Sequence, residues 1–276
     1  NIFITNGSDD ILNFAFMAFG HKGAVFPDIT YGFYKVFCEL HSVSYEEIPL
    51  KEDFSVFPQD YYNAGKMVVT ANPNAPTGLD ISLCEIEKIV ESNKENVVVI
   101  DEAYVDFGGE TAIPLTKKYD NLIVVRTYSK SRSMAGARLG FSVASEKLTK
   151  DLNKLKFSTN PYNINRMTMA AGIAALKSQR YFKEKNEMTV NIREYTKKGL
   201  EKLGFYVIPS KANFIFVKHN KISGEKYYNE LKNKGILVRH FNGERICEFN
   251  RITIGTEDEM KIFLDITKEI LENENI

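Results

Sequence analysis

Short, continuous apolar runs recur along the first half of the chain, with stretches of helical spacing between them. Runs at residues 67–70, 97–101 and 122–125 consist mostly of β-branched residues, which favour strands. A helical pattern over residues 83–92 separates two of them. Uninterrupted apolar strands that alternate with helices are typical of a parallel sheet covered on both faces. The pattern therefore predicts an α/β fold with a mainly parallel central sheet flanked by helices.

The pattern changes beyond residue 145. From residue 146 to 203 the apolar positions follow helical spacing, with an interruption at Pro161. Further strands are predicted at residues 206–208, 213–217 and 251–254, with helices over residues 224–234 and from residue 257 onward. We therefore expect a large domain over residues 1–149, followed by linking helices and a smaller α+β C-terminal domain over residues 150–276.

The first twenty residues predict a strand, a turn and a buried helix. The strand covers residues 2–5 and the helix covers residues 11–19, with Ser8 or Asp9 as a suitable N-cap between them. Free N–H groups at a helix N-terminus form an anion site. Taken alone, the simpler interpretation is an ordinary capped helix, and a phosphate site becomes the favoured interpretation only beside the residues described next.

Polar residues follow two of the predicted strands in an order that indicates pyridoxal phosphate (PLP). Asp101 ends an apolar run and should emerge at the carboxyl edge of the sheet, where open α/β sheets bind ligands. Ser129 and Lys130 follow the next strand, and Arg138 lies eight residues further on. A lysine can form a Schiff base with an aldehyde, a carboxylate favours a protonated ring nitrogen, and an arginine fork suits phosphate oxygens. Each residue alone would indicate little, but their order favours a PLP enzyme.

Neighbouring residues could complete such a site. Tyr104 is three residues beyond the acid and could reach the phenolic oxygen of the cofactor ring. The hydroxyls of Thr127 and Ser129 lie next to the lysine in sequence and could bond a phosphate. Tyr31 follows a predicted strand at residues 24–26 and could stack on a flat ring. Because the chain has 14 Tyr and 19 Phe, a role in the core is the alternative for Tyr31.

These residues resemble the fold-type I PLP aminotransferases, and within that family the histidinol-phosphate subgroup. The resemblance extends over essentially the whole chain and rests on residues 7–10, 73–78, 101–107, 126–130 and 135–141. The segments typical of the subgroup are residues 161–165, 212–214 and 250–256. The resemblance implies transamination between L-histidinol phosphate and 2-oxoglutarate in histidine biosynthesis, with residues 1–149 as a PLP-binding large domain.

The resemblance also implies a role for each candidate residue. Lys130 would carry the cofactor, Asp101 would pair with its ring nitrogen, and Tyr104 would bond its ring oxygen. The phosphate would be held by Ser8, Asp9, Ser129 and Arg138, while Tyr31 would stack on the ring. Arg251 would grip the anionic group of the substrate, and Arg239 aligns with a second substrate-binding arginine. Without the resemblance, an arginine on a strand is more often exposed or paired with a carboxylate.

Two features depart from the family pattern. The family commonly has an asparagine that bonds the ring oxygen at the position of Ala75, so Asn74, Asn72 or Tyr104 alone must make this bond. We count Asn74 among the candidate cofactor-binding residues. The chain also starts at Asn1, inside the strand before the phosphate site. The resemblance implies several dozen preceding residues, including an arm over the substrate and a tyrosine that reaches the cofactor of a homodimer partner.

Composition excludes several other classes of protein. Lys+Arg 36 balances Asp+Glu 36, which gives no indication of nucleic acid or an acidic membrane surface as a partner. Three scattered cysteines without a Cys-x-x-Cys pair indicate reduced thiols in a cytoplasm and neither a disulfide framework nor a metal site. No apolar stretch reaches the roughly 18 residues of a membrane span. We therefore expect a cytoplasmic protein, and the resemblance implies an enzyme that acts on an anionic amino donor and a 2-oxo acid.

Two alternatives remain open at this stage. One is a different PLP enzyme of the same fold, either similar to threonine-phosphate decarboxylase or an aminotransferase of aromatic or broad specificity. The other is a catalytically inactive PLP-binding protein. The segments at residues 161–165 and 250–256 favour histidinol phosphate over the first, and the intact cofactor-anchoring residues disfavour the second.

Overall fold

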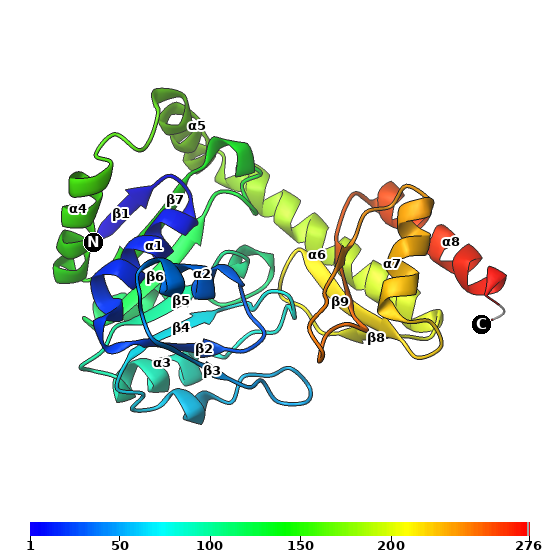
Figure 1. Cartoon of the computed structure of the whole chain (residues 1–276). Coiled ribbons are helices and arrows are strands. Elements are labelled where there is room, and N and C mark those ends of the chain that lie inside the picture. Colours follow the sequence, from blue (N-terminus) through cyan, green and yellow to red (C-terminus); the bar gives the residue numbers. More distant parts are fainter. Residues whose placement is uncertain (275) are drawn as a thin grey trace.

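A computed structural model describes residues 1–274 and 276, and it contains two β-sheets joined by helices (Figure 1). The larger sheet has seven strands in the order β1-β7-β6-β5-β4-β2-β3. Their bounds are β1 Ile2–Thr5, β2 Ala24–Pro27, β3 Tyr45–Ile48, β4 Met67–Ala71, β5 Val98–Asp101, β6 Leu122–Thr127 and β7 Gly140–Ala144. The five strands from β3 to β6 are parallel, which confirms the mainly parallel sheet, whereas β7 runs antiparallel to both of its neighbours. The connection before β7 holds no crossover α-helix, so the chain returns in the opposite direction.

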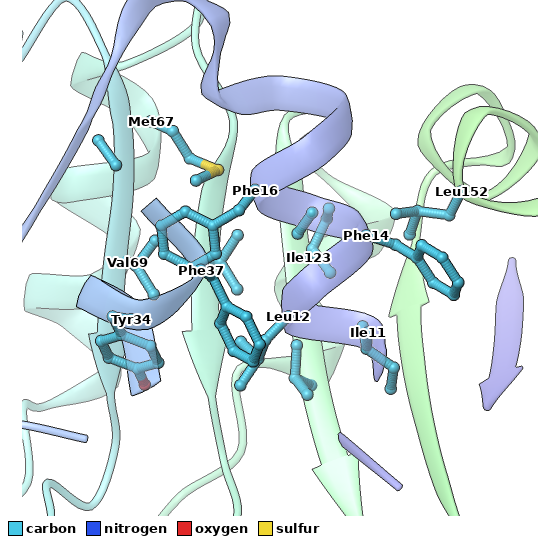
Figure 2. Close-up of a cluster of buried hydrophobic side chains, with 14 of the residues drawn as sticks. Ile11, Leu12, Phe14, Phe16, Tyr34, Phe37, Met67, Val69, Ile123 and Leu152 are labelled. Carbon is cyan, nitrogen blue, oxygen red and sulfur yellow. The ribbon is translucent and has the colours of Figure 1, made fainter. Parts of the chain in front are cut away.

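One face of this sheet is covered by α1 (Ser8–Phe19) and α2 (Phe33–Leu40). Alternate residues of the central strands point into this layer, where the side chains of Phe16 and Phe37 pack against them (Figure 2). The strand residues in this cluster are Met67, Val69, Val99, Ile123 and Val125. Helix α1 therefore starts at the carboxyl edge of the sheet while its apolar face is fixed in the core.

The other face is covered by α3 (Leu83–Ser92), as the spacing over residues 83–92 predicts. Its buried residues Ile86, Ile89 and Val90 pack against the strand residues that alternate with the first set. These are Val68, Val98, Ile100, Leu122 and Val124. Because both faces are covered, each central strand is apolar at consecutive positions.

Three helices connect the two sheets: α4 (Glu146–Thr159), α5 (Arg166–Lys177) and α6 (Gln179–Lys202). The expected domain boundary at residue 149 falls inside α4, which packs against α1. The helical pattern is interrupted around Pro161, and the long helix α6 then runs from the larger sheet to the smaller one (Figure 1). Among the helices of the described residues, none combines the length and apolar character needed to cross a membrane.

The smaller sheet is antiparallel throughout, with strand order β10-β11-β9-β8. Its strands are β8 Phe205–Ile208, β9 Phe214–His219, β10 Arg239–His240 and β11 Asn250–Thr253. The helices α7 (Gly224–Asn233) and α8 (Glu257–Asn273) pack with β8, β9 and β11 in one apolar cluster. A second cluster links the two sheets, because Phe216 of β9 packs with Ile29 and Phe54 of the larger unit. The smaller sheet is thereby brought close to loops at the carboxyl edge of the larger one.

Candidate active site

A cavity of about 140 Å³ lies at the carboxyl ends of β4, β5 and β6. Nine of the residues predicted from the sequence line it: Ser8, Asp9, Tyr31, Asp101, Tyr104, Thr127, Ser129, Lys130 and Arg138. The rest of the wall is small and apolar, formed by Ala71, Pro73, Ala75, Ala103 and Ala135. Three predicted residues, Asn74, Arg239 and Arg251, are not part of this wall. The fold thus brings residues from the first 140 positions together around one cavity.

Asp101 is the most buried charged group of the cavity, with 5% of its surface exposed. As the last residue of β5 it pairs in register with Ala71 of β4 and Val125 of β6. One carboxylate oxygen accepts the N–H of Ala103 at 3.2 Å, and the other accepts the hydroxyl of Tyr34 at 3.0 Å. Burial raises the pKa of Asp101 to about 6, and the bond from Tyr34 partly opposes that rise.

Tyr34 is a site residue that sequence reasoning missed. Its side chain is fully buried in the cluster beneath α1, and Figure 2 shows it among those apolar side chains. Tyr34, Phe37 and Cys38 form the buried face of α2, a helix that was not predicted from the sequence. No sequence pattern reveals that the hydroxyl at the rim of this core reaches Asp101.

The start of α1 and Arg138 form a cradle for an anion. Helix α1 begins at Ser8 with Gly7 as its N-cap at φ 88°, and no side chain caps it, so the expectation of Ser8 or Asp9 as N-cap is wrong. Gly7 has a positive φ that residues with a side chain rarely adopt, and a Cβ there would lie 2.4 Å from a guanidinium nitrogen of Arg138. Glycine therefore permits both the left-handed backbone and the close approach of the arginine. The N–H groups of the first turn have no side-chain cap, and Ser8, Asp9 and Arg138 all line the cavity.

Side chains around this cradle are connected by hydrogen bonds. The Asp9 carboxylate accepts from Arg138 at 3.0 Å and from the Tyr31 hydroxyl at 2.9 Å. Thr127 donates to the Ser129 hydroxyl at 3.0 Å, and Arg138 donates to the same hydroxyl at 3.4 Å. Because the Asp9 carboxylate is already bonded, its contribution to an anion site would come from its backbone N–H.

Lys130 and Tyr104 connect the cavity with the smaller sheet. Lys130 is exposed, and its Nζ lies 5.4 Å from the centroid of the Tyr104 ring. Tyr104 packs edge-on against Phe214 of β9 at 5.0 Å between ring centroids. The guanidinium of Arg251 in β11 lies over the same Phe214 ring at 5.0 Å. Phe214 thus lies between Arg251 and Tyr104 of the cavity wall, and the Nε of Arg251 is buried without a partner among the described residues.

Arg239 is placed differently from Arg251, although the two residues are opposite each other in β10 and β11. Arg239 is exposed, and its guanidinium lies 5.5 Å from the centroid of the Phe241 ring. The structure therefore brings Arg251 toward the cavity through Phe214 and shows no such approach for Arg239.

The amides of Asn74 and Asn72 are committed to the surrounding loops. Asn74 is 3% exposed, donates to the carbonyl of Ile29 at 2.9 Å, and accepts from Thr30 at 2.8 Å. Asn72 bonds both the N–H and the carbonyl of Ile81. Neither amide lines the cavity, so the geometry does not support Asn74 as a cofactor ligand. Of the three alternatives for the ring oxygen, Tyr104 is the one that the cavity wall contains.

The chemistry of these groups fits PLP. A buried carboxylate is normally paired with a cation, yet Asp101 has no hydrogen bond to a basic side chain within the described residues. A protonated ring nitrogen would supply that charge. The uncapped helix start, Arg138 and the Ser129 hydroxyl suit a phosphate. In the described part of the chain, no group of three or more His, Cys, Asp or Glu side chains is arranged to hold a metal ion.

Known proteins are similar to this chain in sequence and in fold. The family described as aminotransferase class I and II matches residues 1–266. A histidinol-phosphate aminotransferase from Brachyspira hyodysenteriae is 51% identical over 276 residues, which cover 99% of this chain and 78% of that protein. The crystal structure of the histidinol-phosphate aminotransferase from Clostridium acetobutylicum aligns with a TM-score of 0.90 at 27% identity, covering 99% of this chain and 84% of that one. The crystal structure of histidinol-phosphate aminotransferase from Sinorhizobium meliloti in complex with pyridoxal-5'-phosphate shares the fold. It aligns with a TM-score of 0.87 at 23% identity, covering 98% of this chain and 77% of that one.

The burial of Asp101 predicts how the stability of the cofactor-free protein depends on pH. The folded-state pKa of about 6 lies above the ordinary value of 3.8, so the folded protein binds a proton at Asp101 more tightly than the unfolded chain does. The stability of the folded state is therefore greatest below about pH 4 and falls as pH rises from about 4 to 6. Asp101→Asn should therefore raise the free energy of unfolding at pH 7.5 by about 1–3 kcal/mol and have little effect at pH 4. Urea unfolding at both pH values measures this, with exposed Asp80→Asn as the control. Equal effects of the two substitutions at pH 7.5 would contradict the raised pKa of Asp101.

Proposed function

The chain belongs to the class I and II aminotransferases, and from this premise we propose that it transfers the amino group of L-histidinol phosphate to 2-oxoglutarate. The products would be imidazole acetol phosphate and L-glutamate, which is a step of histidine biosynthesis. The observation that carries the proposal is the convergence of Asp101, Lys130 and Arg138 on one cavity, in a chain 51% identical to a histidinol-phosphate aminotransferase. The enzyme depends on PLP, as its family does.

Each part of PLP has a matching group in the cavity. Arg138, the Ser129 hydroxyl and the first N–H groups of α1 would hold the phosphate. Asp101 would keep a proton on the ring nitrogen, and Tyr104 would donate to the ring oxygen in place of the asparagine that Ala75 replaces. When bound, PLP withdraws electrons from the substrate Cα, which makes the Cα proton removable.

Lys130 would carry out the proton transfer. It is the one amine among the residues that line the described cavity. Its Nζ would first hold the cofactor covalently and then, once the amino donor has replaced it, accept the proton from the donor Cα. The Tyr104 ring at 5.4 Å provides a favourable contact for the lysine while it is charged.

Arg251 would bind the anionic end of both substrates. The phosphate of the amino donor and the distal carboxylate of 2-oxoglutarate require the same kind of partner, and the arginine fork suits both. The position of Arg251 over Phe214, which packs against Tyr104 of the cavity wall, supports this role, and its Nε has no partner among the described residues. Arg239 remains a candidate for a second contact with substrate.

The choice of amino donor is the direct test of the proposed function. The PLP-loaded protein should form glutamate from 2-oxoglutarate at least about tenfold more efficiently with histidinol phosphate than with histidinol or phenylalanine, because a lost charged contact is worth about 1.4 kcal/mol or more. Coupled glutamate assays over this panel measure the ratio. Carbon dioxide released from threonine phosphate without glutamate would instead establish a decarboxylase, and PLP binding without turnover of any donor would establish an inactive protein.

Substitution of Arg251 should impair the handling of both substrates. Arg251→Ala is expected to raise the half-saturating concentrations of histidinol phosphate and of 2-oxoglutarate by about 10- to 100-fold, while PLP affinity stays within about twofold. Arg132→Ala is a matched control, because Arg132 also lies 5.0 Å over a phenylalanine, Phe182, and also has a buried nitrogen without a partner among the described residues. Steady-state kinetics and PLP titration separate the two effects. A loss confined to PLP affinity, or equal losses in both variants, would disprove the role.

We further propose that the enzyme is a homodimer in the cytoplasm. Helix α5 buries only Thr168, Gly172 and Ala175 among its described residues and exposes large apolar side chains on its remaining surface. The exposed side chains of α5 are Met167, Met169, Ile173 and Leu176. An apolar patch of this kind is typical of an interface, and a two-fold dimer is the commonest assembly. The three unpaired cysteines suit a reducing compartment.

A charge on α5 tests the dimer. The full-length protein should have the mass of a dimer in light scattering, and Ile173→Glu should shift it to the monomer because an unpaired charge at an apolar interface is costly. Leu237→Glu is the control, since Leu237 is 77% exposed and lies between α7 and β10. A monomeric native protein, or an Ile173→Glu dimer as stable as the native one, would argue against this interface.

A further inference from the structure

The hydroxyl of Tyr34 is the one side-chain donor bonded to Asp101 among the described residues. It donates to Oδ2 at 3.0 Å from a side chain with no exposed surface. The ring is held on three sides by aromatic neighbours, with ring centroids 6.2 Å from Phe16, 5.8 Å from Phe26 and 5.6 Å from Tyr31. The donor is therefore fixed by the core and has little freedom to point elsewhere.

The bond from Tyr34 leaves Asp101 able to accept further hydrogen bonds. A carboxylate has about four lone-pair positions, and the structure fills one on each oxygen, from Ala103 N–H and from Tyr34. Both bonds fix the plane of the carboxyl group. The remaining acceptor capacity belongs to a group that lines the cavity, where a ring nitrogen would be bound.

We propose that Tyr34 is a positioning residue that holds Asp101 as an oriented carboxylate toward the nitrogen of the cofactor ring. A hydroxyl that donates to a carboxylate stabilises the charged form of the acid, so the proton shared between Asp101 and the ring stays on the ring. Without that donor, the acid would compete better for the proton. The inference rests on the proposed PLP function for its consequence, while the coupling of Tyr34 to Asp101 can be measured without any cofactor.

Several other groups act on the same carboxylate and set the direction of the expected effect. Burial is the largest influence and raises the pKa of Asp101, and the negative charge of Asp9 on α1 raises it further. The Tyr34 bond is the largest opposing influence, followed by the N–H of Ala103 and the charge of Lys130. The Tyr31 hydroxyl also interacts electrostatically with Asp101. Deleting the Tyr34 hydroxyl should therefore raise the pKa of Asp101.

The first experiment uses the cofactor-free protein. Carbon-13 NMR of labelled aspartate carboxyls should place the midpoint of Asp101 near pH 6 in the native protein, and Asp101→Asn identifies the signal. In Tyr34→Phe the midpoint should rise by about one pH unit or more, as the loss of a hydrogen bond to a charged group requires. Incorporation of 3-fluorotyrosine at position 34, which makes the hydroxyl a stronger donor, should move the midpoint down. An unchanged midpoint in both variants would overturn the inference.

The second experiment uses the PLP-loaded protein with nitrogen-15 in the cofactor ring. At pH 7.5 the native protein should give the resonance of a protonated ring nitrogen. Tyr34→Phe should move this resonance toward the value of an unprotonated nitrogen that accepts a hydrogen bond. An unmoved resonance would overturn the inference. If the native protein fails to bind PLP, the proposed function fails, while the first experiment still decides the coupling.

Tyr61→Phe is the matched control for both measurements. Tyr61 is also fully buried, but it packs on the other face of the sheet and its hydroxyl has no partner among the described residues. Its replacement removes the same atom from the core and should leave the Asp101 midpoint and the ring-nitrogen resonance unchanged. Equal shifts in Tyr61→Phe and Tyr34→Phe would mean that a general change in the core is responsible, and this would also overturn the inference.

Discussion

The structure of the site depends on one carboxylate, Asp101, which the central strand β5 carries into the protein interior. The cost of burying this charge is visible in its raised pKa, and two hydrogen bonds offset only part of that cost. A cation in the cavity would offset the rest. The buried carboxylate is thus a candidate for binding and chemistry, because perturbed acids in a cavity are typical of functional sites.

The remaining groups surround this charge from separate parts of the chain. The start of α1 and Arg138 meet on one side, where Gly7 leaves room for the guanidinium. Lys130 and Tyr104 lie on another side and contact the smaller sheet through Phe214. The cavity wall thus contains the candidate phosphate and ring groups, while the candidate substrate residue Arg251 lies outside it, over Phe214.

Local patterns in the sequence predicted most of the strands and helices and nine residues of the cavity wall, but not β3, β10 or α2. Continuous apolar runs identify covered strands, and the residue that ends such a run must lie at the sheet edge. The patterns failed where contacts between distant segments decide the outcome. Tyr34 has the spacing of an ordinary core residue, Gly7 with a φ of 88° takes the N-cap position close to Arg138, and the amide of Asn74 is used by Ile29 and Thr30. Spacing alone encodes none of these contacts.

The central claim is that this cavity holds PLP with Lys130 as its covalent anchor beside Asp101. The most direct test is borohydride reduction of the PLP-loaded protein, followed by proteolysis and mass spectrometry of the labelled peptide. The account predicts a single pyridoxyl group on Lys130 and no labelled peptide from Lys130→Ala. A label on a different lysine in the native protein, or the same amount of label in the variant, would contradict it.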